Sequence, residues 1–229
     1  MPRFIGVLSL ADRFPRIPGD ASNSDSYPLP ARLREIPAGD HALTDAQGRA
    51  DPALTAAFLK AAQELAAEGA VAITSSCGFL ATAQQEIAAA VPVPVLLSPL
   101  SMVHTARQLG GGRPVGILTG RSGFPGPATL AAADISPDQV RIEALETEPA
   151  FARTFLCNGA DWRADIDPAA IEAAVLAAAG RLLDRAPETG AFLLEHGSLP
   201  PYAAALRRET GRPVLSILDA MPMLVGKCA

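Results

Sequence analysis

Hydrophobic and polar positions follow two different periods along the chain. Short, nearly uninterrupted apolar runs at residues 3–10 and 190–194 predict buried β-strands. Alanine-rich stretches with helical character occupy residues 51–70 and 167–183. Strands that alternate with helices are typical of α/β proteins with mainly parallel sheets. We therefore expect an α/β fold.

This order of elements occurs twice. "RFIGVLSL" at 3–10 resembles "RPVGILTG" at 113–120, with glycine at the fourth position of each. The helical stretches that follow both begin with Asp-Pro, at Asp51 and Asp167, where aspartate predicts an N-cap and proline the first helical residue. "GAVAITSSCG" then parallels "GAFLLEHG", and each of these apolar runs ends at a glycine. A repeat of this length indicates duplicated half-domains rather than a solenoid.

Spacing within the repeat makes Cys77 and His196 equivalent. Pro94 follows Cys77 by 17 positions, and Pro213 follows His196 by the same number. Both residues fall at the carboxyl end of a parallel strand, where open α/β sheets bind ligands. We expect two pseudo-symmetric halves, each a parallel sheet flanked by helices, with the active site in the cleft between them.

The expected boundaries follow from this pairing. The first half comprises residues 1–105 together with 212–229 and carries Cys77. The second half comprises residues 106–211 and carries His196. If the strand ends of the two halves face each other, both side chains lie in one cleft.

A thiol and an imidazole on opposite walls suit acid–base chemistry. The positive end of a helix dipole favours a thiolate, so we expect the pKa of Cys77 to move from about 8.5 toward neutrality. Histidine, with an ordinary pKa of about 6.5, exchanges protons near working pH. One group can take a proton from carbon beside a carbonyl while the other delivers one to the opposite face. No phosphate loop, dinucleotide fingerprint or metal-ligand spacing accompanies them, so no cofactor is expected.

Neighbouring hydroxyl and N–H groups are candidates for binding a small carboxylate. Ser9 and Thr119 each end the first strand of one half, Asn23 belongs to a long loop, and the others adjoin Cys77 or His196. The predicted substrate-binding residues are Ser9, Asn23, Ser75, Ser76, Gly78, Phe79, Thr119, Gly197 and Ser198. No arginine or lysine falls at a predicted strand end, so carboxylate binding is expected to use hydroxyls and backbone N–H groups.

Two segments together resemble the aspartate/glutamate racemase superfamily: "AVAITSSCGFLATAQQEI" and "GAFLLEHGSLPPYAAALRRETGRPVLSILD". This superfamily includes amino-acid and hydantoin racemases, maleate isomerase and arylmalonate decarboxylase. The resemblance extends over nearly the whole chain. It implies two pseudo-symmetric α/β halves, a cofactor-independent mechanism in the cleft between them, and a catalytic role for Cys77.

The chain departs from the racemase pattern at three positions. His196 stands where most racemases of the superfamily have a second cysteine, and Gly197 where they have threonine. Ser9 replaces the acidic residue that assists glutamate racemases, so that activity is not expected. Three interpretations stay open: a racemase or isomerase with a Cys77–His196 pair, a lyase or decarboxylase with one thiol, and an inactive paralogue that binds a small carboxylate.

Composition narrows the class of protein. The 229 residues carry a net charge of −5 without a useful cluster of lysine and arginine, so nucleic acid is not an expected partner. No apolar stretch approaches the roughly 20 residues of a membrane span. Three cysteines without metal spacing favour a reducing compartment, with the cytoplasm as default. Cys157 and Cys228 are expected to be structural or incidental, and His41 solvated. A homo-oligomer is compatible with the sequence.

Overall fold

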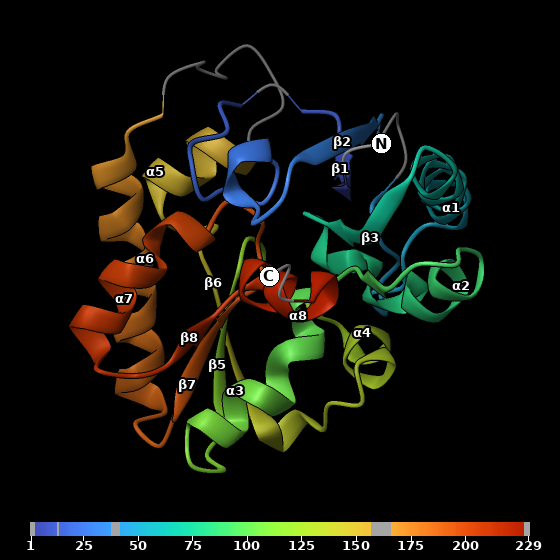
Figure 1. Ribbon diagram of the computed structural model, residues 1–229. Coiled ribbons are helices and arrows are strands. Elements are labelled where there is room, and N and C mark those ends of the chain that lie inside the picture. Colours follow the sequence, from blue (N-terminus) through green and yellow to red (C-terminus); the bar gives the residue numbers. More distant parts are fainter. Residues whose placement is uncertain (1–2, 13, 38–41, 157–165, 227–229) are drawn as a thin grey trace.

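A computed structural model describes residues 3–12, 14–37, 42–156 and 166–226, arranged as two parallel sheets flanked by helices (Figure 1). The predicted α/β class and the duplication are confirmed. The expectations for His41, Cys157 and Cys228 lie outside these residues. No helix in the described ranges is both long and apolar enough to cross a membrane.

The two sheets have the same strand order. The first sheet runs β2-β1-β3-β4, with β1 at Phe4–Leu10, β2 at Ala31–Ile36, β3 at Ala70–Ser75 and β4 at Val95–Leu96. The second runs β6-β5-β7-β8, with β5 at Val115–Thr119, β6 at Val140–Ala144, β7 at Ala191–Leu194 and β8 at Val214–Leu215. Every pairing within them is parallel.

Helices connect the strands in matching positions. The α-helices are α1 (Pro52–Ala67), α2 (Gln84–Ala89), α3 (Val103–Leu109), α4 (Pro127–Ala132), α5 (Pro149–Phe151), α6 (Pro168–Arg185), α7 (Ala203–Thr210) and α8 (Met221–Val225). Short 3₁₀ helices precede several of them, namely η2 (Gly78–Ala83), η3 (Pro99–Met102), η6 (Pro200–Tyr202) and η7 (Ile217–Ala220). The Asp51 carboxylate accepts N–H bonds at the start of α1, and Asp167 does so at the start of α6, as predicted for N-caps.

Strand register confirms the equivalence of Cys77 and His196. Thr74 pairs with Leu96, and Leu193 pairs with Leu215. Cys77 lies three residues after Thr74, and His196 lies three residues after Leu193. The backbone therefore places both residues at the same point beyond the carboxyl end of the corresponding strand.

The ends of the two halves cross over. Residues 212–229 were expected in the first half, but β8 pairs with β7, so Val214 and Leu215 belong to the second sheet. Helix α8 then packs against β3 of the first sheet, while α3 packs against β7 of the second. In Figure 1, α8 lies between the two halves. The assigned boundary is therefore wrong for β8. This edge strand completes the second sheet, and the chain returns to the first half only at α8.

Candidate functional site

Two turns, at residues 75–78 and 195–198, form the site. Cys77 precedes η2 as its N-cap and is buried, at 6% exposure. The buried Ser75 hydroxyl accepts the Cys77 N–H at 3.1 Å and donates to the carbonyl of Leu97 at 2.6 Å. Ser75, predicted to bind substrate, therefore uses its hydroxyl to shape the turn. Phe79 packs its ring against Phe58 in the core of the first half.

The turns touch each other through their glycines. A Cβ atom at Gly78 would lie 1.8 Å from Oε1 of Glu195, and a Cβ atom at Gly197 would lie 2.7 Å from the carbonyl oxygen of Ser76. Gly78 thus leaves room for Glu195, the residue before His196, and Gly197 leaves room for Ser76, the residue before Cys77. The carboxyl ends of β3 and β7 therefore meet in one junction, as the duplication predicted.

Equivalent hydrogen bonds support the two turns. The Ser76 hydroxyl donates to Ser9 Oγ at 3.1 Å, and Ser9 bonds in turn to Ser22 at 2.8 Å. The Thr119 hydroxyl donates to Oε2 of Glu195 at 2.7 Å. Ser9 and Thr119 do lie at the junction, as expected, and their hydroxyls are bonded to protein groups.

Burial holds Cys77 as a thiol. It raises the pKa of Cys77 to about 11, while bonds from Ser76 and the Leu10 backbone and the charge of Arg16 lower it by less. Sγ lies 3.8 Å from the Ser76 hydroxyl. The expectation of a pKa near neutrality is wrong, because desolvation of the sulfur outweighs the dipole of the short helix η2.

His196 is held as a neutral ring among aromatic side chains. Its centroid lies 5.3 Å from that of Phe151 and 5.8 Å from that of Phe155. Burial lowers the pKa of His196 to about 4, with smaller contributions from Arg16 and Arg121. The Ser198 N–H donates to Nδ1 at 3.2 Å, so the neutral ring carries its proton on Nε2. His196 therefore does not supply the imidazolium that would deliver a proton opposite a Cys77 thiolate.

Arg16 supplies a cation that the sequence analysis missed. Its Nη1 donates to Ser198 Oγ at 3.1 Å and to both oxygens of Asp20 at 3.2 Å, and Nη2 contacts Asp12. The guanidinium lowers the pKa of Cys77 and that of His196, so one positive charge acts on both walls. The described residues from Asp12 to Asp20 form a loop and not a helix, so their i,i+4 spacing gave no sequence signal for these contacts.

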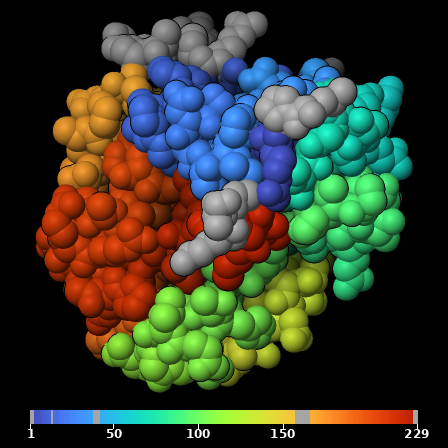
Figure 2. All heavy atoms as spheres, in the orientation of Figure 1, coloured from blue at the N-terminus to red at the C-terminus, as the bar shows by residue number. Residues whose placement is uncertain are grey.

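The loop that carries Arg16 closes over the second half. Ala21 N–H donates to the Gly197 carbonyl at 2.9 Å, and Gly19 packs on Pro201. Asn23 Nδ2 donates to the Arg16 carbonyl at 2.8 Å, so Asn23 fixes this loop. In Figure 2 the blue N-terminal segment lies directly against orange and red segments of the second half.

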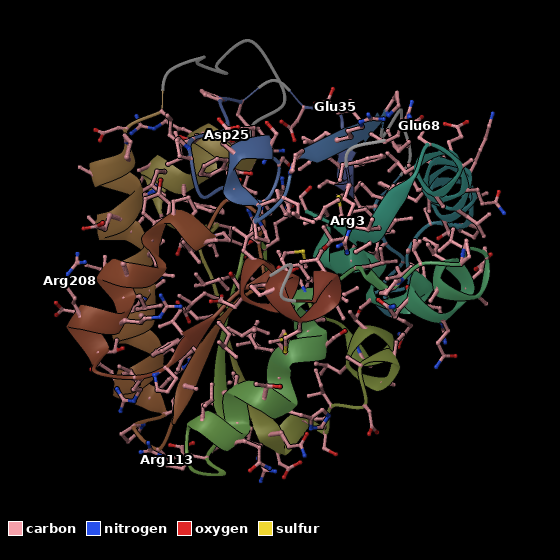
Figure 3. All side chains as sticks on the ribbon, in the orientation of Figure 1. Arg3, Asp25, Glu35, Glu68, Arg113 and Arg208 are labelled. Carbon is pink, nitrogen blue, oxygen red and sulfur yellow. The ribbon has the colours of Figure 1, made fainter. Side chains whose placement is uncertain are left out.

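Glu195 is the second site residue that the sequence analysis missed. It is 6% exposed, and burial raises the pKa of its carboxyl to about 7, against a smaller opposite effect of the Thr119 hydrogen bond. Labelled charged residues such as Arg113 and Arg208 instead lie at the rim of the molecule (Figure 3). An acidic residue ending the apolar run "AFLLE" was the signal.

Two open hollows of the surface lie away from this junction. One of about 510 Å³ is lined by residues of α1, η2 and α4, and one of about 430 Å³ by the loop 122–125 and β6. The junction of Cys77, Glu195 and His196 borders neither of them. Among the described residues, no three histidine, cysteine or acidic side chains cluster as a metal site.

Solved structures with this fold include two kinds of enzyme. Arylmalonate decarboxylase is 18% identical with a TM-score of 0.62, covering 99% of this chain and 94% of its own. Allantoin racemase from Pseudomonas fluorescens is 15% identical with a TM-score of 0.61, covering 96% and 88%. Glutamate racemase from Bacillus anthracis is 15% identical with a TM-score of 0.57, covering 96% and 78%. At these identities the likeness shows the fold that this chain shares with them.

A curated relative with a similar sequence is a lyase. Dimethylsulfoniopropionate lyase 5 of Emiliania huxleyi (strain CCMP1516) is 29% identical over 225 residues, which is 93% of this chain and 43% of the relative. The chain thus spans less than half the length of that protein. No family model matches the chain. These relatives are enzymes, namely racemases, a decarboxylase and a lyase.

Proposed function

We propose that the protein is a cofactor-independent lyase of a small carboxylic acid, in which Cys77 exchanges a proton with the carbon beside the carboxylate. The observation that carries this proposal is the state of the equivalent residue, His196. Its ring is neutral, packed against Phe151 and Phe155, with Nδ1 occupied by the Ser198 N–H. Of the two equivalent residues, Cys77 is therefore the one left to do acid–base chemistry on the reacting carbon.

A racemase would need both walls to change roles. It removes a proton with one group and returns one with the other, and the reverse direction needs the opposite protonation states. With the pKa of Cys77 raised and that of His196 lowered, thiol and neutral imidazole are strongly favoured over thiolate and imidazolium. A lyase does not need the imidazolium form of His196. Elimination uses the Cys77 thiolate alone, and decarboxylation uses the Cys77 thiol.

The curated relative suggests the reaction to test first. In elimination from dimethylsulfoniopropionate, the Cys77 thiolate takes a proton from the carbon next to the carboxylate. The electrons of that C–H bond form the double bond of acrylate, the C–S bond breaks, and dimethyl sulfide leaves with its electron pair. Decarboxylation of a malonate is the alternative, in which CO₂ leaves and the Cys77 thiol protonates the carbon.

Arg16 is the proposed anchor of the substrate carboxylate. It is fixed by Asp12 and Asp20, reaches Ser198 of the opposite wall, and acts electrostatically on Cys77 and His196. A guanidinium matches the fork of a carboxylate.

Arg16→Met is expected to raise KM roughly 10- to 100-fold, because a hydrogen bond to a charged group contributes about 1.5–3 kcal/mol. Steady-state kinetics on an accepted carboxylate measure this change. Arg16→Lys should fall between the two, since it keeps the charge and loses the fork. Unchanged KM in Arg16→Met would remove Arg16 from substrate binding.

Racemisation is the second candidate, favoured by the matching register of Cys77 and His196. His196→Cys restores a second thiol at the equivalent position. We expect this variant to gain racemisation of an α-substituted acid, measured as loss of optical rotation, if the site keeps a two-base geometry. Racemisation by the wild type that is lost in His196→Cys would instead favour the Cys77–His196 pair as the working one.

The class of reaction is tested by identifying products. The protein is incubated in D₂O with dimethylsulfoniopropionate, an arylmalonate and chiral α-substituted acids. An alkene or CO₂ supports the lyase, whereas deuterium uptake with loss of rotation supports the racemase. Binding of an acid without turnover or exchange supports the inactive paralogue and overturns the proposed function.

A further inference from the structure

Glu195 is an unusual residue for the centre of the junction. Carboxylates are almost never this buried without a paired charge, because losing water is costly for the ionised form. No salt bridge to Glu195 occurs within the described part of the chain, and its hydrogen bond comes from the neutral Thr119 hydroxyl. The buried carboxyl therefore favours its protonated form at the junction.

We assign the carboxyl proton to Oε1 by taking the Thr119 hydroxyl as a donor. Oε2 accepts the Thr119 hydroxyl hydrogen at 2.7 Å, which leaves Oε1 to hold the carboxyl proton. Oε1 is the oxygen that contacts Gly78 of the opposite wall, next to Cys77. The neutral side chain thus presents an O–H donor to the side of the junction where Cys77 lies.

The other half has no equivalent acid. Ser76 occupies the matching position and bonds to Ser9, the counterpart of Thr119. The backbone arrangement is therefore formed equally well by a small hydroxyl residue. A buried acid at only one of two equivalent positions is not needed to hold the turn.

We propose that neutral Glu195 donates its Oε1 hydrogen to the carboxylate of the bound substrate and stabilises the negative charge that gathers there during proton transfer at the adjacent carbon. This inference rests on the proposed function for the identity of the ligand. A neutral acid suits the role because it offers a hydrogen bond without adding a repelling charge. The ionised form of Glu195 would oppose the same carboxylate.

Other titrating groups near the junction respond in different pH ranges. Burial brings the pKa of Asp12 to about 6, while that of His196 lies at about 4 and that of Cys77 at about 11. The charged and titratable groups on the surrounding segments include Asp12, Arg16, Asp20, Tyr27, Glu35, Cys77, Arg121 and His196. Asp12 is the one whose titration comes nearest to that of Glu195, so Asp12→Asn serves as a control.

Binding of propionate, measured by calorimetry from pH 6 to pH 9, tests the proposal without requiring turnover. Ionisation of Glu195 should weaken wild-type binding by about tenfold per pH unit above pH 7. Glu195→Gln keeps an N–H donor in place of Oε1–H, so its affinity should stay nearly constant over this range. Glu195→Leu should bind weakly throughout, and Asp12→Asn should keep the slope above pH 7.

Several results would overturn the proposal. They are wild-type affinity that does not change with pH, the same slope in wild type and Glu195→Gln, tight binding by Glu195→Leu, or no binding of propionate at any pH. The proposed lyase activity fails on a different observation, namely full turnover without the Cys77 thiol. The two proposals can therefore be rejected separately.

Thermal unfolding supplies an independent readout. The pKa of Glu195 is raised from 4.5 to about 7 on folding, so the folded state holds a proton that the unfolded state releases between these values. Wild-type stability should fall as pH rises through this window. Glu195→Gln should then have a higher Tm than wild type at pH 8, with the difference vanishing below pH 4.5. Equal pH dependence in both proteins would contradict a neutral Glu195.

Turnover should respond to pH differently from binding. Above pH 7 the neutral fraction of Glu195 falls while the thiolate fraction of Cys77 rises by the same factor. Wild-type kcat/KM for elimination is therefore expected to stay level from about pH 7 to pH 10. In Glu195→Gln it should rise about tenfold per pH unit over this range, because only Cys77 still titrates.

Discussion

Cys77→Ala is expected to reduce kcat/KM by about 10²- to 10⁴-fold, the range that a positioned acid–base group contributes. The substitution removes the proposed group that exchanges a proton with the substrate carbon. Cys77→Ser should lose a similar factor, because a hydroxyl is a much weaker acid than a thiol. Steady-state rates of product formation, taken with the Tm of each variant, measure the effect.

The remaining cysteines provide matched controls for this loss. Cys157→Ser and Cys228→Ser make the same chemical change at positions expected to be incidental. We expect near wild-type turnover from both. Retention of full activity by Cys77→Ala, with all three variants folded, would remove this thiol from the mechanism.

Gly78→Ala is expected to disrupt the junction between the halves. The added Cβ would lie 1.8 Å from Oε1 and 2.9 Å from Cδ of Glu195, so the buried carboxyl must leave its place. Overpacking of this kind costs about 1–3 kcal/mol of stability. Activity should fall by more than stability alone explains, because Cys77 is the adjacent residue. Chemical denaturation and steady-state kinetics measure the two effects.

A second glycine separates steric overlap from the general effect of adding a methyl group. Gly180 lies inside α6 with no atom within 4 Å of a built Cβ, so Gly180→Ala should be neutral or slightly stabilising. Shortening the opposing side chain in Gly78→Ala/Glu195→Ala should restore much of the lost stability. Additive losses in that double variant would show that the two residues do not meet in solution.

Local signals made the fold and the paired positions predictable. Asp-Pro pairs start α1 and α6, apolar runs form β3 and β7, and equal spacing places Cys77 and His196 alike. These features depend on neighbouring residues, which a sequence displays directly. The edge strand β8 was misplaced because a two-residue strand gives too short a pattern to assign it to a sheet.

The protonation states and two site residues depend on distant contacts. Arg16 meets Ser198 across 182 positions, and Glu195 meets Thr119 across 76. The dipole at a helix start was visible in the sequence, whereas the burial of Cys77 that outweighs it arises only when the halves pack together. The sequence therefore predicted where Cys77 and His196 lie in the fold, but not their protonation states.

The most direct test of the account compares dimethylsulfoniopropionate with the same compound carrying deuterium on the carbon next to its carboxylate. If Cys77 removes that hydrogen, the wild-type protein should form acrylate, and its kcat/KM should be lower with the deuterated compound. Cys77→Ala should lose the activity. Equal rates with both compounds, together with undiminished turnover by Cys77→Ala, would contradict proton transfer to this thiol.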